Sequence, residues 1–401
     1  MSTLTLDSGR RQRLPMRAAA PGAPPTLVPT RVLFAGGGTG GHLYPAIAAA
    51  RALLELAPGS EVHFAGSDRP LERRILLEAG FPHHALPTAP WRGARRAFGF
   101  AAAQARGLVA SWRLLRELSP QVVVGLGGFP SLGPALAARL RGLPLALFEP
   151  NASAGKANRL LAHLASEAWV HFAATKLPCP LVPTGTPVGP RALLGPEVGP
   201  GAARRALGLA PEKPVLLICG GSQGSAALNG WVSAALRAGA ASPELSYLHL
   251  AGSEEAAVRL REDYAAAGCA ARVEAFLPGI GIAYRAASLA VVRGGGATLA
   301  ELQACGLPAA VVPMPGSADD HQRKNAAAYV AEGGLRWLEE EALQPADFVA
   351  LAYEARDEGR LRELAAQARA GGRPGAAEVV ARRLVALGST RARGGAAGRD
   401  Q

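Results

Sequence analysis

Short hydrophobic segments alternate with longer segments of helical pattern along the chain. They fall at 31–35, 61–65, 121–125, 144–148 and 168–172 in the first half, and at 214–219, 246–251, 272–276, 289–293 and 309–313 in the second. Continuous apolar runs of this length are typical of parallel strands buried on both faces. The alternation predicts an α/β protein with doubly wound parallel sheets.

Two glycine-rich loops divide the chain in the same way. Residues 31–42 read RVLFAGGGTGGH and residues 214–225 read PVLLICGGSQGS, so each half opens with a strand and a glycine turn. A stretch rich in proline and glycine at 182–201 is typical of a linker. The length of 401 residues also fits two domains. We therefore expect two Rossmann-like domains that face each other across a cleft.

The expected domains cover 31–188 and 189–373, with a helix at 374–388 as a candidate to complete the first. Residues 1–30 lack the continuous apolar stretch of a signal peptide and are rich in alanine and arginine. Residues 389–401 have a similar composition. We expect a disordered leader and a disordered tail.

A glycine loop between a strand and a helix is suited to bind phosphate. Backbone N–H groups come close to the ligand there, and the helix start adds the positive end of its dipole. Gly36, Gly38 and Gly41 fit G-x-G-x-x-G, which nicotinamide dehydrogenases also carry. A dehydrogenase would need an acidic residue closing its second strand, and Asp68 is poorly spaced for that role. A tight turn without a ligand is a further alternative.

The second loop also fits the G-x-S-x-G pattern of α/β-hydrolases, at 220–224. Asp320 and His321 follow in the order of a hydrolase triad. They are adjacent, however, whereas the triad acid normally lies well before its histidine, so a hydrolase is disfavoured.

Two more glycine clusters follow predicted strands, at 125–131 and 293–301. The second places Thr298 and Glu301 at a helix start. Glu301 could accept both hydroxyls of a ribose, and Thr298 could donate to a sugar or a phosphate. A helix cap with a carboxylate near the helix dipole explains the same spacing.

The net charge of +12 arises from 43 Lys and Arg against 31 Asp and Glu. It favours an anionic partner: nucleic acid, an acidic lipid surface or a phosphorylated substrate. An arginine-rich composition is also what a GC-rich genome encodes. We expect no nucleic-acid partner, because zinc-finger, RNP-like and recognition-helix patterns are missing from the sequence. No stretch approaches the roughly 18 apolar residues of a membrane span.

Residues 91–118 combine arginines with aromatic residues. Leu108, Trp112 and Leu115 fall on one face of the predicted helix. Basic residues beside aromatics suit the surface of an anionic bilayer. The alternative is a helix that packs on the core and has a solvated arginine rim.

The four cysteines, Cys179, Cys219, Cys269 and Cys305, lie far apart and without metal-ligand spacing. They predict free thiols in a reducing compartment. No D-x-D pair follows a strand, and the helix start at Ser222 could stabilise a leaving group instead. We therefore expect no obligatory metal or other cofactor.

Six motifs follow one another along the chain: GGGTGGH (36–42), GLGGFPS (125–131), EPNASAGKANR (149–159), GGSQGSAALN (220–229), RGGGATLAE (293–301) and DDHQRKNA (319–326). Taken in order, they are more specific than any single glycine loop. They carry a resemblance, from about residue 31 to about residue 387, to the MurG-type N-acetylglucosaminyltransferases that convert lipid I to lipid II in bacterial peptidoglycan synthesis. The resemblance implies the two-domain GT-B fold. It also implies inverting transfer from UDP-N-acetylglucosamine to the 4-hydroxyl of the muramoyl-pentapeptide of lipid I, at the cytoplasmic face of the membrane.

The same resemblance implies the substrate contacts. Ser222 and its loop would hold the donor diphosphate, Glu301 the ribose and the Leu277 backbone the uracil, while the first domain would bind the acceptor diphosphate. The further residues implied for the donor are Arg191, Gln223, Gly224, Asn229, Gly296, Ala297, Thr298, Leu299, Ala300, Gln322 and Asn325. Those implied for the acceptor side are Thr39, Gly40, Gly41, Gly127, Gly128 and Asn151.

The chain departs from the family pattern at three places. Residues 148–151 read Phe-Glu-Pro-Asn where the family has His-Glu-Gln-Asn, and Phe129 stands where tyrosine is usual. At Gly189 the interdomain motif lacks its arginine, which follows two residues late as Arg191. Another UDP-sugar enzyme of this fold, such as a glycolipid transferase or a UDP-sugar 2-epimerase, and a non-catalytic paralogue are therefore kept as alternatives.

Two residues are candidates for the base that deprotonates the acceptor hydroxyl. His42 lies at the start of the first helix, and an ordinary histidine pKa near 6.5 suits a base at neutral pH. It could also simply cap its own glycine loop. Glu149 lies at the end of a strand, where ligands of α/β proteins collect, and is the second candidate.

Overall fold

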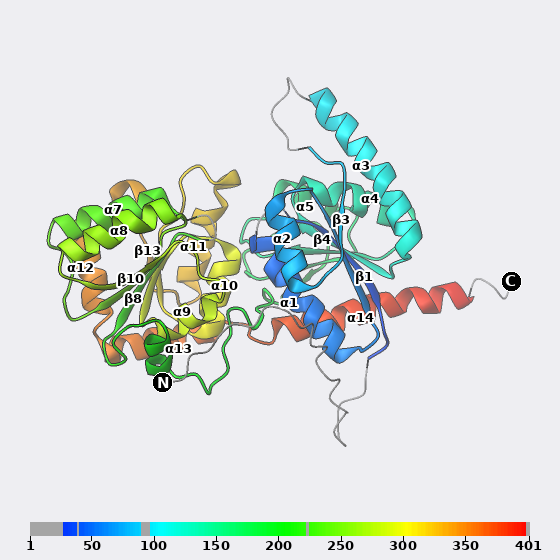
Figure 1. Ribbon diagram of the computed structural model, residues 1–401. Helices are drawn as coiled ribbons and strands as arrows, with labels where there is room; N and C mark the ends of the chain where they lie inside the picture. The colour runs from blue at the N-terminus through cyan, green and yellow to red at the C-terminus, as the bar shows by residue number, and fades with distance from the viewer. Residues whose placement is uncertain (1–26, 38–39, 90–96, 222–223, 398–401) are drawn as a thin grey trace, which may run out of the picture.

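The chain folds into two α/β domains that lie side by side in a computed structural model (Figure 1), which describes residues 27–37, 40–89, 97–221 and 224–397. The helices are α1 Gly40–Leu56, α2 Pro70–Ala79, α3 Ala97–Leu118, α4 Leu132–Leu140, α5 Lys156–Leu161, α6 Pro200–Ala206, α7 Ala226–Arg237, α8 Glu254–Ala266, α9 Ile280–Ala286, α10 Gly296–Cys305, α11 His321–Ala331, α12 Pro345–Glu354, α13 Glu358–Gly371 and α14 Ala376–Ala397.

The first domain is built on a seven-stranded parallel sheet of order β3-β2-β1-β4-β5-β6-β7. The order reverses between β1 and β4, so a crevice opens at their carboxyl ends, where ligands of such sheets bind. A Cβ on Gly36 would lie 2.5 Å from the Gly127 carbonyl oxygen, so the two glycine loops touch there. The strands are β1 Arg31–Gly36, β2 Glu61–Gly66, β3 His83–Ala85, β4 Val122–Gly127, β5 Leu145–Glu149, β6 Glu167–Val170 and β7 Leu181–Val182.

The second domain repeats this plan with a six-stranded parallel sheet of order β10-β9-β8-β11-β12-β13. Its order reverses between β8 and β11, and the loops that follow these two strands lead into α7 and α10. The strands are β8 Val215–Cys219, β9 Ser246–Leu250, β10 Ala270–Glu274, β11 Leu289–Val292, β12 Ala309–Val311 and β13 Arg336–Trp337.

The predicted fold class, two Rossmann-like parallel sheets, is confirmed. Each predicted hydrophobic segment overlaps a strand of the structure, most of them within two residues at each end. Three strands were missed: β3, β7 and β13. Each is two or three residues long and lies at a sheet edge, where a continuous apolar run is not required.

The C-terminal helix α14 returns to the first domain and packs beside α1 (Figure 1). Val380, Ala381 and Leu384 enter the same buried cluster as Val32 and Ile47. The helix therefore adds to the first domain's core, although the intervening chain belongs to the second domain.

Both predicted disordered ends need correction where the structure describes them. The tail was expected to begin at residue 389, but α14 continues to Ala397. In the leader, Thr30 is buried and its N–H donates to Ser60 Oγ (3.0 Å), while the Leu27 N–H donates to the Leu56 carbonyl (3.1 Å). Residues 1–26 and 398–401 lie outside the described residues.

Two general expectations can be compared with the described residues. All four cysteines carry free thiols. None of the helices in the described ranges combines the length and hydrophobicity needed to span a bilayer.

Candidate active site

The second-domain glycine loop has a backbone that only glycine permits at two places. A Cβ on Gly224, whose φ is +70°, would lie 2.5 Å from the Gly252 Cα. A Cβ on Gly220 would lie 2.5 Å from the Ser225 nitrogen. Ser225 then caps α7 by accepting the Leu228 N–H (3.2 Å). The loop thus directs the N-terminus of α7 into the cleft. The predicted contacts Ser222 and Gln223 lie outside the described residues.

Arg293 also lines this cleft, and the sequence reasoning missed it. Its guanidinium donates to Ser225 Oγ (2.6 Å) and to the Val312 carbonyl (3.2 Å), and it forms an ion pair with Glu340. It therefore fixes the start of α7 relative to β11 and β12. The sequence analysis included it in the motif at 293–301 but assigned it no contact.

Glu301 projects from α10 into a pocket of about 100 Å³ that Leu277, Phe276 and Thr298 also line. Oε2 accepts a hydrogen bond from the Tyr284 hydroxyl (2.8 Å). Burial raises the pKa of the Glu301 carboxyl, while the Tyr284 hydrogen bond and the Arg191 charge oppose the rise. The pocket thus pairs one buried carboxyl acceptor with apolar walls, which suits a nucleoside.

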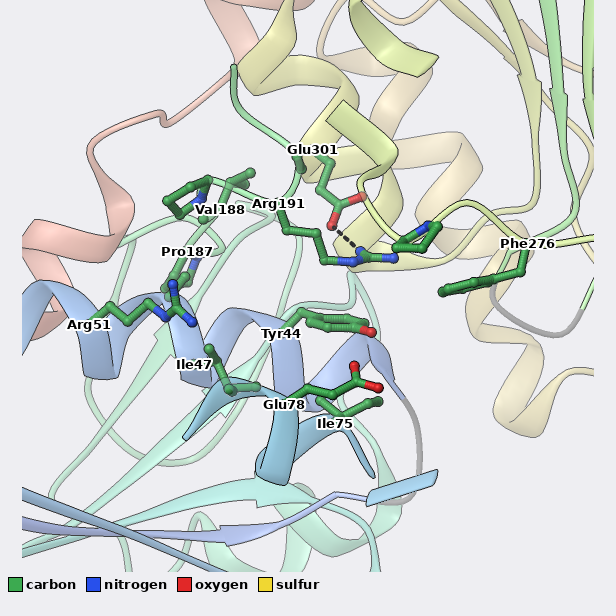
Figure 2. A pocket seen from close by; sticks show the side chains of 16 residues that line it. Tyr44, Ile47, Arg51, Ile75, Glu78, Pro187, Val188, Arg191, Phe276 and Glu301 are labelled. Atoms are coloured by element: carbon green, nitrogen blue, oxygen red, sulfur yellow. Dashed lines mark ion pairs between the residues drawn. The ribbon is translucent and has the colours of Figure 1, made fainter. Parts of the chain in front are cut away.

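Arg191 reaches this pocket despite its late position in the family motif. Figure 2 shows its guanidinium between Glu301 and the ring of Tyr44. Its Nη1 lies 4.0 Å from Glu301 Oε1, and its Cζ lies 4.0 Å from the centroid of the Tyr44 ring. The displacement along the sequence therefore does not remove an arginine from the site. The ring of Tyr44, which the sequence reasoning did not single out, packs against the Arg191 guanidinium and supports it.

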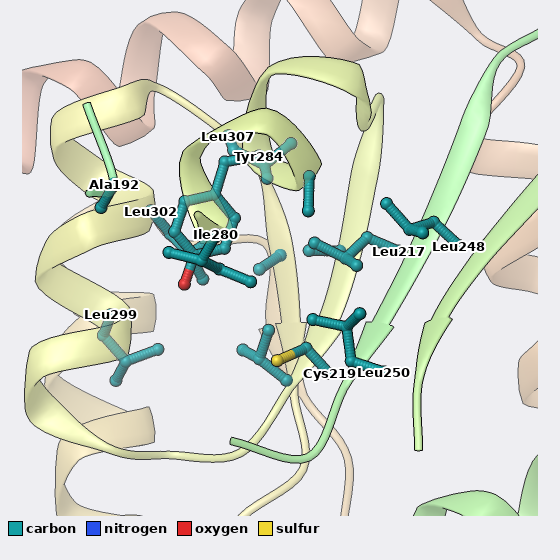
Figure 3. Packing of buried hydrophobic residues seen from close by; sticks show 14 of the residues in the cluster. Ala192, Leu217, Cys219, Leu248, Leu250, Ile280, Tyr284, Leu299, Leu302 and Leu307 are labelled. Atoms are coloured by element: carbon teal, nitrogen blue, oxygen red, sulfur yellow. The ribbon is translucent and has the colours of Figure 1, made fainter. Parts of the chain in front are cut away.

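Two residues predicted as donor contacts, Leu299 and Ala300, are not among those that line the two parts of the cleft. Leu299 and Ala300 are buried, and Figure 3 shows Leu299 packed in the cluster with Leu302 and Tyr284. The Leu299 N–H donates a hydrogen bond to the Gly295 carbonyl (3.0 Å). These two residues hold α10 in place, whereas Gly296, Ala297 and Thr298, the first three residues of the helix, line the cleft.

The wide part of the cleft, about 620 Å³, lies between the domains. The first domain lines it with Gly41, His42, Pro150 and Asn151, and the second domain with the starts of α7 and α10 and with His321 and Gln322. Gln322 Oε1 accepts the N–H groups of Met314 (3.0 Å) and Gly294 (3.2 Å), so Nε2 is the donor that it can offer a ligand. Here the structure brings residues from both domains together.

His42 lies in this cleft opposite His321. Burial, followed by the repulsive charge of His321, lowers the His42 pKa to about 4. The imidazole is therefore neutral at pH 7 and able to accept a proton. Bound diphosphates would bring negative charge and raise this pKa, which would make His42 a stronger base in the complex.

Glu149, the second candidate base, is 2% exposed. Oε1 accepts from the backbone N–H (3.1 Å) and Nδ2 (2.8 Å) of Asn151, and Oε2 from the Gly155 N–H (2.9 Å) and Asn158 Nδ2 (3.0 Å). Burial raises the pKa of its carboxyl, although these hydrogen bonds oppose the shift. Glu149 is thus positioned to orient Asn151, and the geometry favours His42 as the base.

The remaining predicted contacts play other parts in this structure. Asn325 is buried and bonds across the domains, and Asn229 bonds to the Ala251 carbonyl (3.0 Å) and to His249 (3.0 Å). Gly40 lines the nucleoside pocket, whereas Gly127 and Gly128 lie against Gly36 and Gly37 of the first glycine loop. Thr39 lies outside the described residues.

The chain can now be compared with known proteins. It matches the glycosyltransferase family 28 N-terminal domain over residues 32–170 and the family's C-terminal domain over residues 215–380. A protein from Salinibacter ruber is 38% identical over 365 residues, which cover 89% of this chain and 96% of that protein. It is named UDP-N-acetylglucosamine–N-acetylmuramyl-(pentapeptide) pyrophosphoryl-undecaprenol N-acetylglucosamine transferase.

Two further comparisons agree. A protein of the same name from Moorella thermoacetica is 36% identical over 366 residues, which cover 87% of this chain and 97% of that protein. The crystal structure of MurG from Acinetobacter baumannii has a TM-score of 0.70 at 26% identity, covering 89% of this chain and 99% of that one. The resemblance carried by the six motifs is thereby confirmed, and the chain belongs to glycosyltransferase family 28.

Proposed function

We propose that this protein transfers N-acetylglucosamine from UDP-N-acetylglucosamine to N-acetylmuramyl-(pentapeptide) pyrophosphoryl-undecaprenol, the reaction that its relatives' names describe. One observation supports this above all. A single interdomain cleft combines two helix N-termini and a nucleoside pocket from the second domain with His42 from the first.

The proposed donor site follows the cleft. Uracil lies at Leu277 and Phe276, Glu301 accepts the ribose hydroxyls, and the diphosphate meets the N-terminus of α7, whose dipole and N–H groups favour anions. The sugar then lies near Gly296, Thr298 and Gln322.

Transfer is a direct displacement with inversion. The 4-hydroxyl oxygen of the acceptor forms a bond to the anomeric carbon while the bond from that carbon to the β-phosphate oxygen breaks. The hydroxyl proton passes to His42, and the electron pair of the broken bond leaves with UDP. Charge that develops on UDP is stabilised at the N-terminus of α7. A hydrogen-bond donor placed in this way typically lowers the activation barrier by about 3 kcal/mol.

Direct turnover tests the proposal. Purified protein with UDP-N-acetylglucosamine and vesicles containing the undecaprenyl acceptor should release UDP and form a disaccharide lipid in equal amounts. UDP-sugar interconversion without an acceptor would indicate a 2-epimerase instead. Binding of UDP-N-acetylglucosamine without turnover of any acceptor would indicate the non-catalytic paralogue.

We further propose that no metal cofactor is obligatory, because the N-terminus of α7 can stabilise the leaving diphosphate without one. Turnover should therefore be the same, within about twofold, with EDTA as with added magnesium. Loss of turnover in EDTA and recovery with magnesium would contradict this.

Peripheral binding to an anionic membrane is also proposed. α3 packs on the core through Leu114 and Leu115, and Leu108 lies against the same cluster. Of the predicted face of Leu108, Trp112 and Leu115, only Trp112 points outward instead. On the outside, Phe98 is 90%, Val109 53% and Trp112 41% exposed. The exposed Arg106, Arg113 and Arg116 follow on the same helix, while Trp91, Arg92, Arg95 and Arg96 lie outside the described residues.

Sedimentation with vesicles tests the membrane proposal. We expect binding to anionic vesicles at low salt and its loss at high salt, because each basic residue near the surface contributes about 1 kcal/mol. The W112A variant should bind more weakly, whereas V258A, an exposed apolar residue of the second domain (45% exposed), should bind as wild type. Equal binding to neutral vesicles at high salt would show that the exposed arginines of α3 do not drive membrane binding.

A further inference from the structure

The turn before α11 adopts an unusual backbone conformation. Asp319 and Asp320 have φ of +53° and +54°, and in the described part of the chain only Ser119 is a further non-glycine residue with positive φ. Left-handed conformations are unfavourable for residues with a Cβ, although aspartate tolerates them better than most. Such strain persists only where surrounding structure holds it, and it is frequent at functional sites. The turn leads directly into His321 and Gln322, which line the cleft.

The carboxylate of Asp319 is held by the other domain. Its Oδ2 lies 2.8 Å from Arg159 Nη2, and its Oδ1 lies 3.6 Å from Lys156 Nζ. Both basic residues belong to α5 of the first domain. Arg159 also donates to the Ala154 carbonyl (2.9 Å), which fixes the direction of its guanidinium. We call Lys156, Arg159 and Asp319 the interdomain clamp.

Further polar contacts extend the clamp along the first turn of α11. Lys324 Nζ donates to the Asp319 carbonyl (2.9 Å) and to Ser153 Oγ (3.4 Å). Asn325 Oδ1 accepts the Ala152 N–H (2.8 Å), and its Nδ2 donates to Asn151 Oδ1 (3.0 Å). The segment after β5 therefore holds the start of α11 from the opposite side of the cleft.

We propose that Lys156 and Arg159 are positioning residues for the donor sugar. When the first domain closes on Asp319, the clamp holds the left-handed turn and so places His321 and Gln322 against the N-acetylglucosamine unit. The inference rests on the proposed function. It also separates two parts of the donor: the sugar depends on the clamp, whereas UDP, bound by α7, α10 and Leu277, does not.

The expected effect is moderate. The side chains of Asp319, Arg159 and Lys156 are 26%, 45% and 67% exposed, and partly exposed ion pairs are individually weak. Loss of the Arg159 pair, or of both pairs at Asp319, should weaken sugar binding by about 2- to 5-fold.

Calorimetric titration of UDP and of UDP-N-acetylglucosamine tests the proposal. R159Q and D319N should weaken the binding of UDP-N-acetylglucosamine by about 5-fold and leave UDP within about 2-fold of wild type. R159K, which keeps the charge, should bind UDP-N-acetylglucosamine more tightly than R159Q and nearly as tightly as the wild type. D320N is the matched control, because asparagine also tolerates a left-handed backbone and residue 320 does not contribute to the clamp's ion pairs.

The outcomes separate the two proposals. Equal weakening of both ligands in R159Q and D319N, or no weakening of either, would overturn the clamp while leaving the proposed function intact. If wild-type protein binds neither ligand, the proposed function fails, and the inference that rests on it fails with it.

Discussion

Replacement of His42 by alanine is expected to lower kcat by about 10³-fold, within the range of 10² to 10⁴ typical of a lost general base. The residue lies in the cleft at the start of α1, and its imidazole is neutral at pH 7 because burial and the charge of His321 lower its pKa to about 4. The affinity for UDP-N-acetylglucosamine should change little, since the donor is held mainly by the second domain. A loss of kcat smaller than tenfold, with folding intact, would remove His42 from the role of base.

Glu149→Gln is the informative comparison. The carboxylate accepts four hydrogen bonds, two at each oxygen, so an amide would direct its NH₂ group at two of those donors. We expect a lower melting temperature, by several degrees for a loss of about 1 to 3 kcal/mol, and a milder loss of activity than in H42A. A folded E149Q protein as inactive as H42A would instead favour Glu149 as the base.

The pH dependence tests His42 as the base. A base must be unprotonated, so activity should fall as pH drops through the base's pKa. In kcat/KM, which reports the free enzyme, the acid limb of His42 should lie near pH 4. In kcat it should lie higher, because the bound diphosphates raise the pKa of His42. An acid limb that coincides in both profiles would contradict this account.

Gly296→Ala is expected to lower kcat/KM by about 10²-fold, because misplacement of reacting groups by about 1 Å has a cost of that order. A Cβ at this position would lie 2.3 Å from the Pro150 carbonyl oxygen, which belongs to the other domain. That contact is backbone and cannot rotate away, so the domains must move apart. The distance from His42 to the sugar then increases, while each domain keeps its own core.

Gly295→Ala provides a close control. The nearest atom to its Cβ would be Thr298 Oγ1 at 3.7 Å, an ordinary contact, and its φ of −75° suits alanine. G295A should therefore keep activity within a few fold, and both variants should melt near the wild-type temperature. Equal activity of G296A and G295A would show that close approach of Gly296 and Pro150 is not needed for transfer.

The sequence predicted most of this fold because buried parallel strands require continuous apolar runs. All the strands except the three short edge strands β3, β7 and β13 carried such a run. The return of α14 to the first domain agrees with the prediction that a helix at 374–388 completes that domain. The helical residues after 388 were missed because alanine and arginine occur both in tails and in surface helices.

The site was only partly predictable. Glu301, Thr298 and His42 follow strands, and the rule that ligands bind at the carboxyl ends of parallel strands located them. Tyr44, Arg293 and the Asp319 clamp depend on contacts between segments far apart in the sequence, which spacing cannot reveal. Leu299 and Ala300, which the motif also includes, have buried side chains because only one side of α10 faces the cleft.

A crystal structure with UDP-N-acetylglucosamine tests the central claim most directly. We predict the nucleotide on the second domain, with uracil at Leu277, ribose at Glu301, and diphosphate at the start of α7. The sugar should face His42 across the cleft. Nucleotide bound to the glycine loop of the first domain, or away from both loops, would contradict the account.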